Sequence, residues 1–304
     1  MPRWCHPVAF AILALPFAFA HAQPLDEMPL PAKACAEELV GPPVVTAKAW
    51  AIADGKTGKL LWGSKEQEPL AIASTTKVMT AYIVLTLAAE DAKVLDEVVT
   101  FSERAAKTGG STSGLKTGEK LTVRELLYGL LLPSGNDAAT AFAEHFGGRL
   151  KAEGKADDAT AKFVAEMNRT AKALKMEETK YLDPHGLGLN KASARDLLTL
   201  AFAALKNATF AKYVATRRYK CEVTDADGKK REVTWNNTNK LLDIEGYEGV
   251  KTGTTTAAGA CLVASGKHDS DHLLLVVLGS ASNDGRYADA RNLYKWAWRE
   301  RKAK

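Results

Sequence analysis

Strand-like segments stand at both ends of this sequence and enclose a long helical block. Near the start, residues 50–53 and 59–62 flank the run Asp54-Gly55-Lys56-Thr57-Gly58, whose glycine-rich turn chemistry is typical of a β-hairpin. Further strand-like segments follow in the last third of the chain, at 218–223, 231–235, 259–264 and 272–278. Strands so far apart predict one antiparallel sheet assembled from both ends of the chain, with a helical lobe inserted between them.

The block between these strands is helical. Residues 78–87 are apolar around nearly the whole circumference of a helix, so that helix must be buried on all sides. Other helical segments are expected at 122–127, 137–146, 161–174 and 194–205, and from residue 285 onward. We therefore place a sheet lobe at about 44–73 and 210–304 and a helical lobe at about 74–209.

The 304 residues include 46% apolar and 25% charged side chains, a composition that excludes general disorder and fibrous repeats. A chain of this length buries a large core and needs neither disulfides nor a metal to fold. The net charge of +5 is spread along the chain without a basic block, so we expect no nucleic-acid partner. The histidines and cysteines are scattered, and zinc hydrolysis lacks its His-Glu-x-x-His helix. We expect no metal and no cofactor.

The first residues indicate an export signal. Met1-Pro2-Arg3 gives a positive start, Val8–Ala20 is an apolar run too short to span a membrane, and Ala20-His21-Ala22 has the small-x-small form of a cleavage site. We predict a signal peptide over 1–22, cleaved at its end, and a proline-rich tether over 23–43. No later run approaches the roughly 18 apolar residues of a membrane helix.

Removal of the signal peptide takes Cys5 with it and leaves Cys35, Cys221 and Cys261. Cys221 and Cys261 both lie in strand-like segments, so a disulfide between them is one alternative. The commoner fate of a free cysteine is that of a small buried hydrophobe, and we interpret both residues in this way.

The first chemical motif is Ser74-Thr75-Thr76-Lys77, at the start of the apolar helix. A serine and a lysine three residues apart share one helix face, and a lysine made neutral by desolvation or by a neighbouring cation can accept the serine's proton. Two observations compete with this interpretation. Ser74 alone is also a good helix N-cap, and Ser113-Gly114-Leu115-Lys116 repeats the spacing in a glycine-rich loop without a supporting helix.

Two further motifs follow in order. Pro133-Ser134-Gly135-Asn136 lies in a tight connection between two helices, where its hydroxyl and amide can project together into a cleft, although Ser-Gly-Asn is also a common turn. Lys251-Thr252-Gly253, with Thr254 next, enters a late strand-like segment. Lys56-Thr57-Gly58 has the same letters but fits a hairpin tip. The order Ser-x-x-Lys, Ser-x-Asn, Lys-Thr-Gly is what separates the functional set from its duplicates.

This ordered triplet resembles the signature of the penicillin-recognising serine enzymes. The run from Ala73 to Tyr82 is similar to the nucleophile helix of low-molecular-mass D-alanyl-D-alanine carboxypeptidases. Ser134-Gly135-Asn136-Asp137-Ala138, Asp183-Pro184-His185-Gly186-Leu187 and Gly249–Thr254 are similar to further signatures of that family. The resemblance covers roughly residues 44–300. It implies a β-lactamase/transpeptidase-like α/β (α+β) fold, in which an antiparallel sheet of N- and C-terminal strands is flanked by helices.

The resemblance also implies residue roles. Ser74 attacks the carbonyl of the penultimate D-Ala and forms an acyl-enzyme. Lys77 is the base for that attack, with its pKa lowered by burial and by the charge of Lys251. Ser134 relays the proton to the leaving amine, and Asn136 holds the peptide amide near Lys77.

Further roles concern the oxyanion and the substrate carboxylate. The backbone N–H groups of Ser74 and Thr254 form the oxyanion hole. Lys251, Thr252, Gly253 and Thr254 bind the carboxylate end of the substrate. For Arg286 two interpretations stand side by side: it adds charge at this carboxylate, or it is a solvated arginine at a helix start.

The expected function is that of a serine D-Ala-D-Ala carboxypeptidase, which trims peptidoglycan stem peptides and is covalently inhibited by β-lactams. We expect secretion across the bacterial inner membrane into the periplasm or cell-wall space. Many members of this family carry a second β-rich domain and a membrane anchor, and this sequence ends with Trp296–Lys304. We therefore expect it to resemble the shorter, soluble members.

Three alternatives are kept. Some shorter members are D,D-endopeptidases that cut peptide crosslinks. A non-catalytic muropeptide or β-lactam sensor can use the same pocket. A class A β-lactamase is disfavoured, because it needs a Glu-x-x-x-Asn loop and Glu166 is followed at that offset by Thr170. His185 is interpreted as a structural turn residue, and His268-Asp269-Ser270-Asp271-His272 as a solvated loop.

Overall fold

The structure is a computed structural model that describes residues 41–150 and 158–303. The predicted signal peptide, the tether up to residue 40 and Cys35 lie outside the described residues. Among the helices that the structure describes, none is long and apolar enough to cross a membrane.

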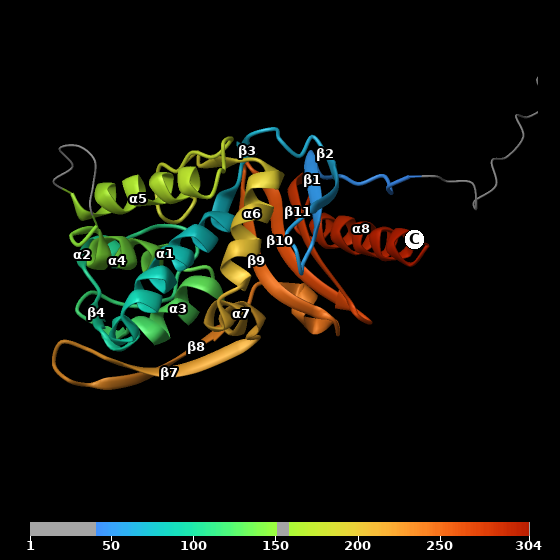
Figure 1. Ribbon diagram of the computed structural model, residues 1–304. Helices are drawn as coiled ribbons and strands as arrows, with labels where there is room; N and C mark the ends of the chain where they lie inside the picture. Colours follow the sequence, from blue (N-terminus) through green and yellow to red (C-terminus); the bar gives the residue numbers. More distant parts are fainter. Residues whose placement is uncertain (1–40, 151–157, 304) are drawn as a thin grey trace, which may run out of the picture. The chain divides into compact units, whose positions relative to one another are not determined.

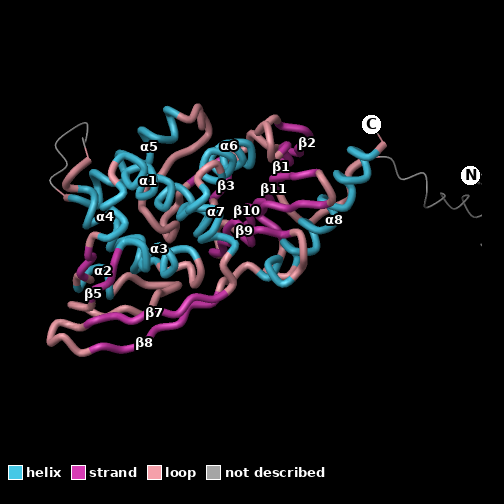
Figure 2. The backbone as a smooth tube through the Cα atoms, turned by 60° about the horizontal axis from the view of Figure 1, so that its bottom comes forward, coloured by secondary structure: helices cyan, strands magenta, loops and turns pink. Residues whose placement is uncertain are grey.

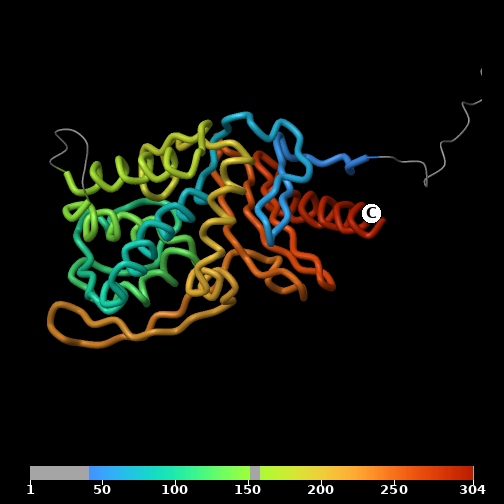
Figure 3. The backbone as a smooth tube through the Cα atoms, in the orientation of Figure 1, coloured from blue at the N-terminus to red at the C-terminus, as the bar shows by residue number. Residues whose placement is uncertain are grey.

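The central sheet joins the two ends of the chain, as the sequence predicts. Its strand order is β2-β1-β11-β10-β9, and every neighbouring pair is antiparallel. The strands are β1 (Ala49–Asp54), β2 (Leu60–Ser64), β9 (Tyr247–Thr255), β10 (Gly259–His268) and β11 (Asp271–Ser280). Ala49 of β1 faces Leu278 of β11, and the tube coloured by sequence shows these distant segments side by side (Figure 3).

Helices cover both faces of this sheet. Helix α8 (Gly285–Lys302) packs on one face, and α6 (Ala194–Leu205) and α7 (Ala208–Ala215) pack on the other (Figure 2). Because strand side chains alternate between faces, Leu275 of β11 points to the α8 side and Val276 to the helical lobe. Both faces are buried, which explains why β11 reads as an unbroken apolar run.

The helical lobe surrounds α1 (Lys77–Glu90), which is buried over most of its length, as expected from its apolar circumference. The other main helices of the lobe are α3 (Val123–Leu131), α4 (Asn136–Gly147) and α5 (Ala159–Ala173), with the short α2 (Glu103–Ala106) beside α4. Thr122 caps α3 in a capping box with Glu125, so the start of this helix is encoded locally.

The strands do not all join one sheet, and that expectation is wrong for the second hairpin. β7 (Arg218–Thr224) and β8 (Lys230–Asn236) join β4 (Val98–Thr100) and β5 (Lys120–Thr122) in a separate four-stranded sheet. This hairpin runs along the helical lobe (Figure 1). Its alternate side chains, among them Val223 and Trp235, are buried there, and an alternating pattern alone does not say which core it meets.

A two-stranded ladder, β3 (Leu70–Ala71) with β6 (Lys191–Ala192), connects the nucleophile segment to the helical lobe. Cys221 in β7 and Cys261 in β10 are both free and buried. The interpretation of these two cysteines as small buried hydrophobes is confirmed, and the disulfide alternative is excluded.

Candidate active site

Ser74 lies in a tight 3-10 turn, η3 (Ala73–Thr76), that runs directly into α1. The N-cap interpretation of Ser74 is wrong, because the cap residues of η3 and α1 are Ile72 and Thr76 and neither helix has a side-chain cap. Ala73 has φ 46°, a left-handed conformation that is unusual for a residue with a side chain. The turn therefore leaves the Ser74 hydroxyl free of any helix-capping role.

Lys77 is completely buried beneath Ser74. Its Nζ lies 2.8 Å from Ser74 Oγ, 2.6 Å from Asn136 Oδ1 and 2.7 Å from the His185 carbonyl oxygen. Burial, and then the positive charge of Lys251, hold the pKa of Lys77 well below its ordinary value, against the opposing pull of the Asp183 and Asp137 carboxylates.

The Ser134–Asn136 turn connects α3 to α4, as the motif predicts. Ser134 has φ 69°, and its Oγ is buried without a hydrogen-bond partner among the described residues. Asn136 Nδ2 donates to the Gly109 carbonyl at 2.7 Å, and this bond turns Asn136 Oδ1 toward Lys77. An unpaired buried hydroxyl is costly in a purely structural turn, which points to a functional position.

The duplicated motifs lie elsewhere. Ser113 is buried and its Oγ donates to the Asp137 carboxylate at 2.8 Å, while Lys116 is exposed. Lys56-Thr57-Gly58 forms the tip of the β1–β2 hairpin, where Asp54 accepts hydrogen bonds from Lys56 N and Thr57 N. Among the described residues, neither Lys116 nor Lys56 has a hydrogen bond to a serine hydroxyl, because Ser113 Oγ bonds to Asp137 and Lys56 Nζ bonds to the Ser270 carbonyl.

Lys251 lies on β9, the edge strand of the central sheet, beside the nucleophile turn. It is buried, and its Nζ donates to the Thr252 carbonyl at 3.0 Å. Burial, followed by the nearby charge of Arg286, lowers the pKa of Lys251 to about 7. At Gly253 a Cβ would stand 2.8 Å from Ser74 N, so the absence of a side chain lets the two backbones meet.

Arg286 is 7% exposed at the start of α8. Its Nη1 donates to Thr254 Oγ1 at 2.9 Å and to the Gly253 carbonyl at 3.1 Å. The interpretation of Arg286 as a solvated helix-start residue is therefore wrong. Thr254 Oγ1 also bonds to Asn283 Oδ1 at 2.8 Å.

Three residues that build this site were not predicted from the sequence. Asp183 accepts hydrogen bonds from the N–H groups of His185 and Gly186, which turns the His185 carbonyl toward Lys77. Burial works to raise the pKa of Asp183, but hydrogen bonds from His185 and Gly186 hold it below its ordinary value. Asn190 Nδ2 ties the same loop to Thr76 Oγ1 at 3.0 Å.

The third missed residue is Thr238, whose Oγ1 lies 2.8 Å from Thr252 Oγ1. The signature-like run at 183–187 was a signal for the first of the three, whereas nothing in the sequence places Thr238 beside β9. The interpretation of His185 as a structural turn residue agrees with this contact, because His185 meets Lys77 through its backbone carbonyl and not through its imidazole ring.

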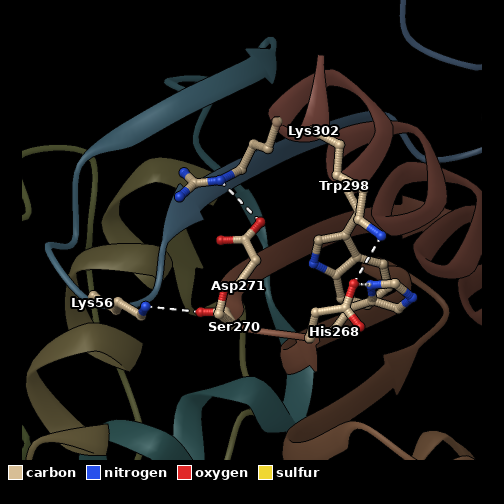
Figure 4. Close-up of a pocket in the computed structure, with 8 residues that line it drawn as sticks. Lys56, His268, Ser270, Asp271, Trp298 and Lys302 are labelled. Atoms are coloured by element: carbon tan, nitrogen blue, oxygen red, sulfur yellow. Dashed lines mark hydrogen bonds and ion pairs between the residues drawn. The ribbon is translucent and has the colours of Figure 1, made fainter. Parts of the chain in front are cut away.

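A separate hollow of about 300 Å³ lies at the β10–β11 turn, where Lys56, His268 and Trp298 contribute to its lining (Figure 4). Its acidic groups are engaged by cations, Asp271 by Arg301 and Asp269 by Lys302. Within residues 41–150 and 158–303, no group of three or more His, Cys, Asp or Glu side chains is placed to hold a metal ion.

An antiparallel sheet whose edge strand carries Lys-Thr-Gly, next to a buried Ser-x-x-Lys turn, defines a serine enzyme of the penicillin-recognising class. The profile of the peptidase S11 family, D-alanyl-D-alanine carboxypeptidase, matches residues 36–282. The chain belongs to this family of serine peptidases.

The chain is 34% identical to a D-alanyl-D-alanine carboxypeptidase of Streptomyces sp. strain K15, over 84% of this chain and 88% of the relative. The crystal structure of the Streptomyces K15 DD-transpeptidase superposes with a TM-score of 0.78 at 33% identity and covers 85% of this chain and 99% of that one. This match confirms the predicted fold.

Two other relatives differ in length and in name. The Bacillus subtilis carboxypeptidase DacF is 33% identical over 83% of this chain, which spans only 62% of it. A D-alanyl-D-alanine endopeptidase of Pseudomonas aeruginosa is 31% identical over 81% of this chain and 75% of its own length.

Proposed function

We propose that this chain is a serine D-Ala-D-Ala carboxypeptidase that removes the terminal D-Ala from peptidoglycan stem peptides through an acyl-enzyme on Ser74. β-Lactams are expected to acylate the same serine. The observation that carries the proposal is the set of three contacts made by Lys77 Nζ.

Those contacts prepare Lys77 to act as a base. The His185 carbonyl and Asn136 Oδ1 only accept hydrogen bonds, so they occupy both N–H groups of a neutral amine. The remaining lone pair then faces Ser74 Oγ at 2.8 Å, within the reach required of a general base. The lowered pKa of Lys77 makes this neutral form accessible.

In the first step Ser74 Oγ bonds to the substrate carbonyl carbon as its proton passes to Lys77. The N–H groups of Ser74 and Thr254 stabilise the oxyanion. The C–N bond then breaks, and we assign to Ser134 the relay of the proton to the leaving amine. Water attacks the acyl-enzyme in the second step and releases the shortened peptide.

Substrate recognition is assigned to both walls of the site. Asn136 holds the substrate amide from the helical side. Lys251, Thr252 and Thr254 on β9 bind the terminal carboxylate. Gly253 lets the β9 backbone lie close to the Ser74 backbone, and Arg286 adds positive charge from the start of α8. The contact of Arg286 with Thr254 supports this grouping.

A D,D-endopeptidase is the second candidate, because a relative named D-alanyl-D-alanine endopeptidase is 31% identical over 81% of this chain. Incubation with purified peptidoglycan and mass analysis separates the two activities. Loss of a terminal Ala from pentapeptide monomers identifies a carboxypeptidase, and conversion of dimers to monomers identifies an endopeptidase. Wild-type protein that binds penicillin but does neither, with Ser74→Ala as the blank, contradicts both and favours a sensor.

The expected compartment is the periplasm or cell-wall space, reached through the signal peptide proposed for residues 1–22. We expect penicillin to be released slowly, because Glu166, Glu177 and Glu178 are followed four residues on by Thr170, Tyr181 and Leu182, whereas the class A β-lactamase loop has an Asn there. Rapid penicillin turnover by the purified protein would favour a β-lactamase instead. N-terminal sequencing of the exported protein tests the cleavage site.

A further inference from the structure

The hydroxyl groups of Thr238 and Thr252 form an isolated pair beside the carboxylate site. Their Oγ1 atoms lie 2.8 Å apart, and either can be the donor. Thr252 is buried on β9, whereas Thr238 is exposed in the loop between β8 and the 3-10 turn η5 (Lys240–Asp243). In the described part of the chain, neither hydroxyl has another side-chain partner.

The backbone of Thr238 is held independently of its hydroxyl. Its N–H donates to the Leu132 carbonyl at 3.1 Å, two residues before Ser134, and its carbonyl accepts from Tyr287 Oη at 3.0 Å. Asn237 Nδ2 donates to the Thr216 carbonyl at 3.0 Å, which holds the preceding residue. The loop therefore connects both walls of the site and presents the Thr238 hydroxyl to β9 in a fixed place.

The two hydroxyl groups carry two protons but share one hydrogen bond, so one hydroxyl proton remains free to donate to a third group. If Thr252 donates to Thr238, the lone pairs of Thr252 face the substrate carboxylate and repel it. If Thr238 donates, the proton of Thr252 is free to bind the anion. An anionic ligand selects the second arrangement, and hydrogen bonds in such a chain polarise one another.

Thr254, the other threonine assigned to the carboxylate, is committed elsewhere. Its hydroxyl accepts a hydrogen bond from Arg286 Nη1 at 2.9 Å and donates its own to Asn283 Oδ1 at 2.8 Å. Thr252 is therefore the threonine hydroxyl best placed to donate to the substrate.

We propose that Thr238 is a positioning residue, which orients the Thr252 hydroxyl as a donor to the terminal carboxylate and so gives the enzyme its preference for free carboxylate ends. This inference rests on the proposed carboxypeptidase function. It is specific to the hydroxyl group, because the backbone contacts of Thr238 persist when the side chain changes.

Thr238→Val removes the hydroxyl and keeps the side-chain shape. The substrates are a peptide ending in D-Ala-D-Ala and the same peptide with its terminal carboxylate converted to an amide. We expect Thr238→Val to lower kcat/KM for the acid about 5- to 20-fold, mainly through KM, and to leave the amide unchanged. Thr238→Ser restores the wild-type preference, and Thr234→Val, an exposed change on the same hairpin, has no effect.

If Thr238→Val lowers kcat/KM equally for the acid and the amide peptide, Thr238 acts only structurally. If kcat/KM for the acid peptide is unchanged, the hydroxyl pair is not used in recognition. Either result overturns the inference. If wild-type protein cleaves neither peptide, the proposed function fails separately. The rate of acylation by penicillin, which carries a corresponding carboxylate, then decides the role of Thr238: the same slowing in Thr238→Val supports it, and an unchanged rate contradicts it.

Discussion

The Cα of Gly186 packs directly on the carbonyl of Ala73, so that a Cβ at Gly186 would lie 2.0 Å from that oxygen. Gly186 has φ +93°, a conformation that favours glycine. The loop that offers the His185 carbonyl to Lys77 is thus in backbone contact with the turn that carries Ser74. Two segments more than a hundred residues apart set the geometry of the nucleophile together.

We expect Gly186→Ala to displace this loop and impair acylation. Overpacking and backbone strain together lower the free energy of unfolding by about 2–4 kcal/mol, and penicillin acylation slows at least about tenfold because the Lys77 contacts are lost. Stopped-flow acylation and thermal unfolding measure the two effects. Gly148→Ala, where a Cβ meets no atom of the described residues within 4 Å, is the control, and equal behaviour of both variants contradicts the packing argument.

Lys77→Gln removes the proposed base. The expected loss of penicillin acylation is about 100- to 10,000-fold, the usual range for general-base removal, and Ser74→Ala abolishes the covalent adduct seen by mass spectrometry. Lys116→Gln changes the exposed lysine of the duplicated motif and leaves the rate unchanged. Strong acylation of Lys77→Gln would mean that another group accepts the proton.

The pH profile reports on Lys251. Its pKa of about 7 means that it is protonated below this pH and loses its charge as the pH rises, so kcat/KM for a carboxylate substrate falls on the alkaline side. Arg286→Gln removes a neighbouring positive charge, raises the pKa of Lys251 and moves this alkaline limb to higher pH. The maximal rate also falls, because Thr254 loses a donor. An alkaline limb that stays in place contradicts this origin.

The stabilising contribution of Glu97, which lies in the helical lobe, depends on pH in the acid range. Hydrogen bonds from Arg149, and to a smaller extent from His145, outweigh desolvation and lower the pKa of Glu97 to about 2. Its stabilising contribution is therefore present above about pH 4.5 and is lost as the pH falls toward 2.

Because the ion pair of Glu97 with Arg149 is partly exposed, we expect Glu97→Gln to lower the free energy of unfolding at pH 7 by only about 1 kcal/mol. The difference from wild type disappears near pH 2. Denaturant titrations at both pH values measure it, and Glu103→Gln in an exposed pair with Lys107 serves as the control. A constant difference at both pH values would exclude an electrostatic cause.

The central sheet was predictable because its strands carry their own signals. The apolar run of β11 indicates a buried strand, and the glycine-rich turn after β1 indicates a hairpin. The helix after Ser74 is apolar around its circumference, which predicts its burial. The hairpin 218–236 shows the limit. Its alternation identifies two paired strands, but only packing determines that they cover the helical lobe rather than extend the main sheet.

The sequence by itself determined the chemistry of this protein: the three ordered motifs, their residue types and the family to which they belong. Tertiary structure decided which copies of those motifs meet. Ser74 and Ser113 have the same spacing to a lysine, yet only Ser74 Oγ contacts its lysine, while Ser113 Oγ bonds to Asp137. Thr238 and the His185 carbonyl likewise belong to the site only because tertiary packing brings them there. Their roles arise from contacts across long sequence separations, which no local pattern encodes.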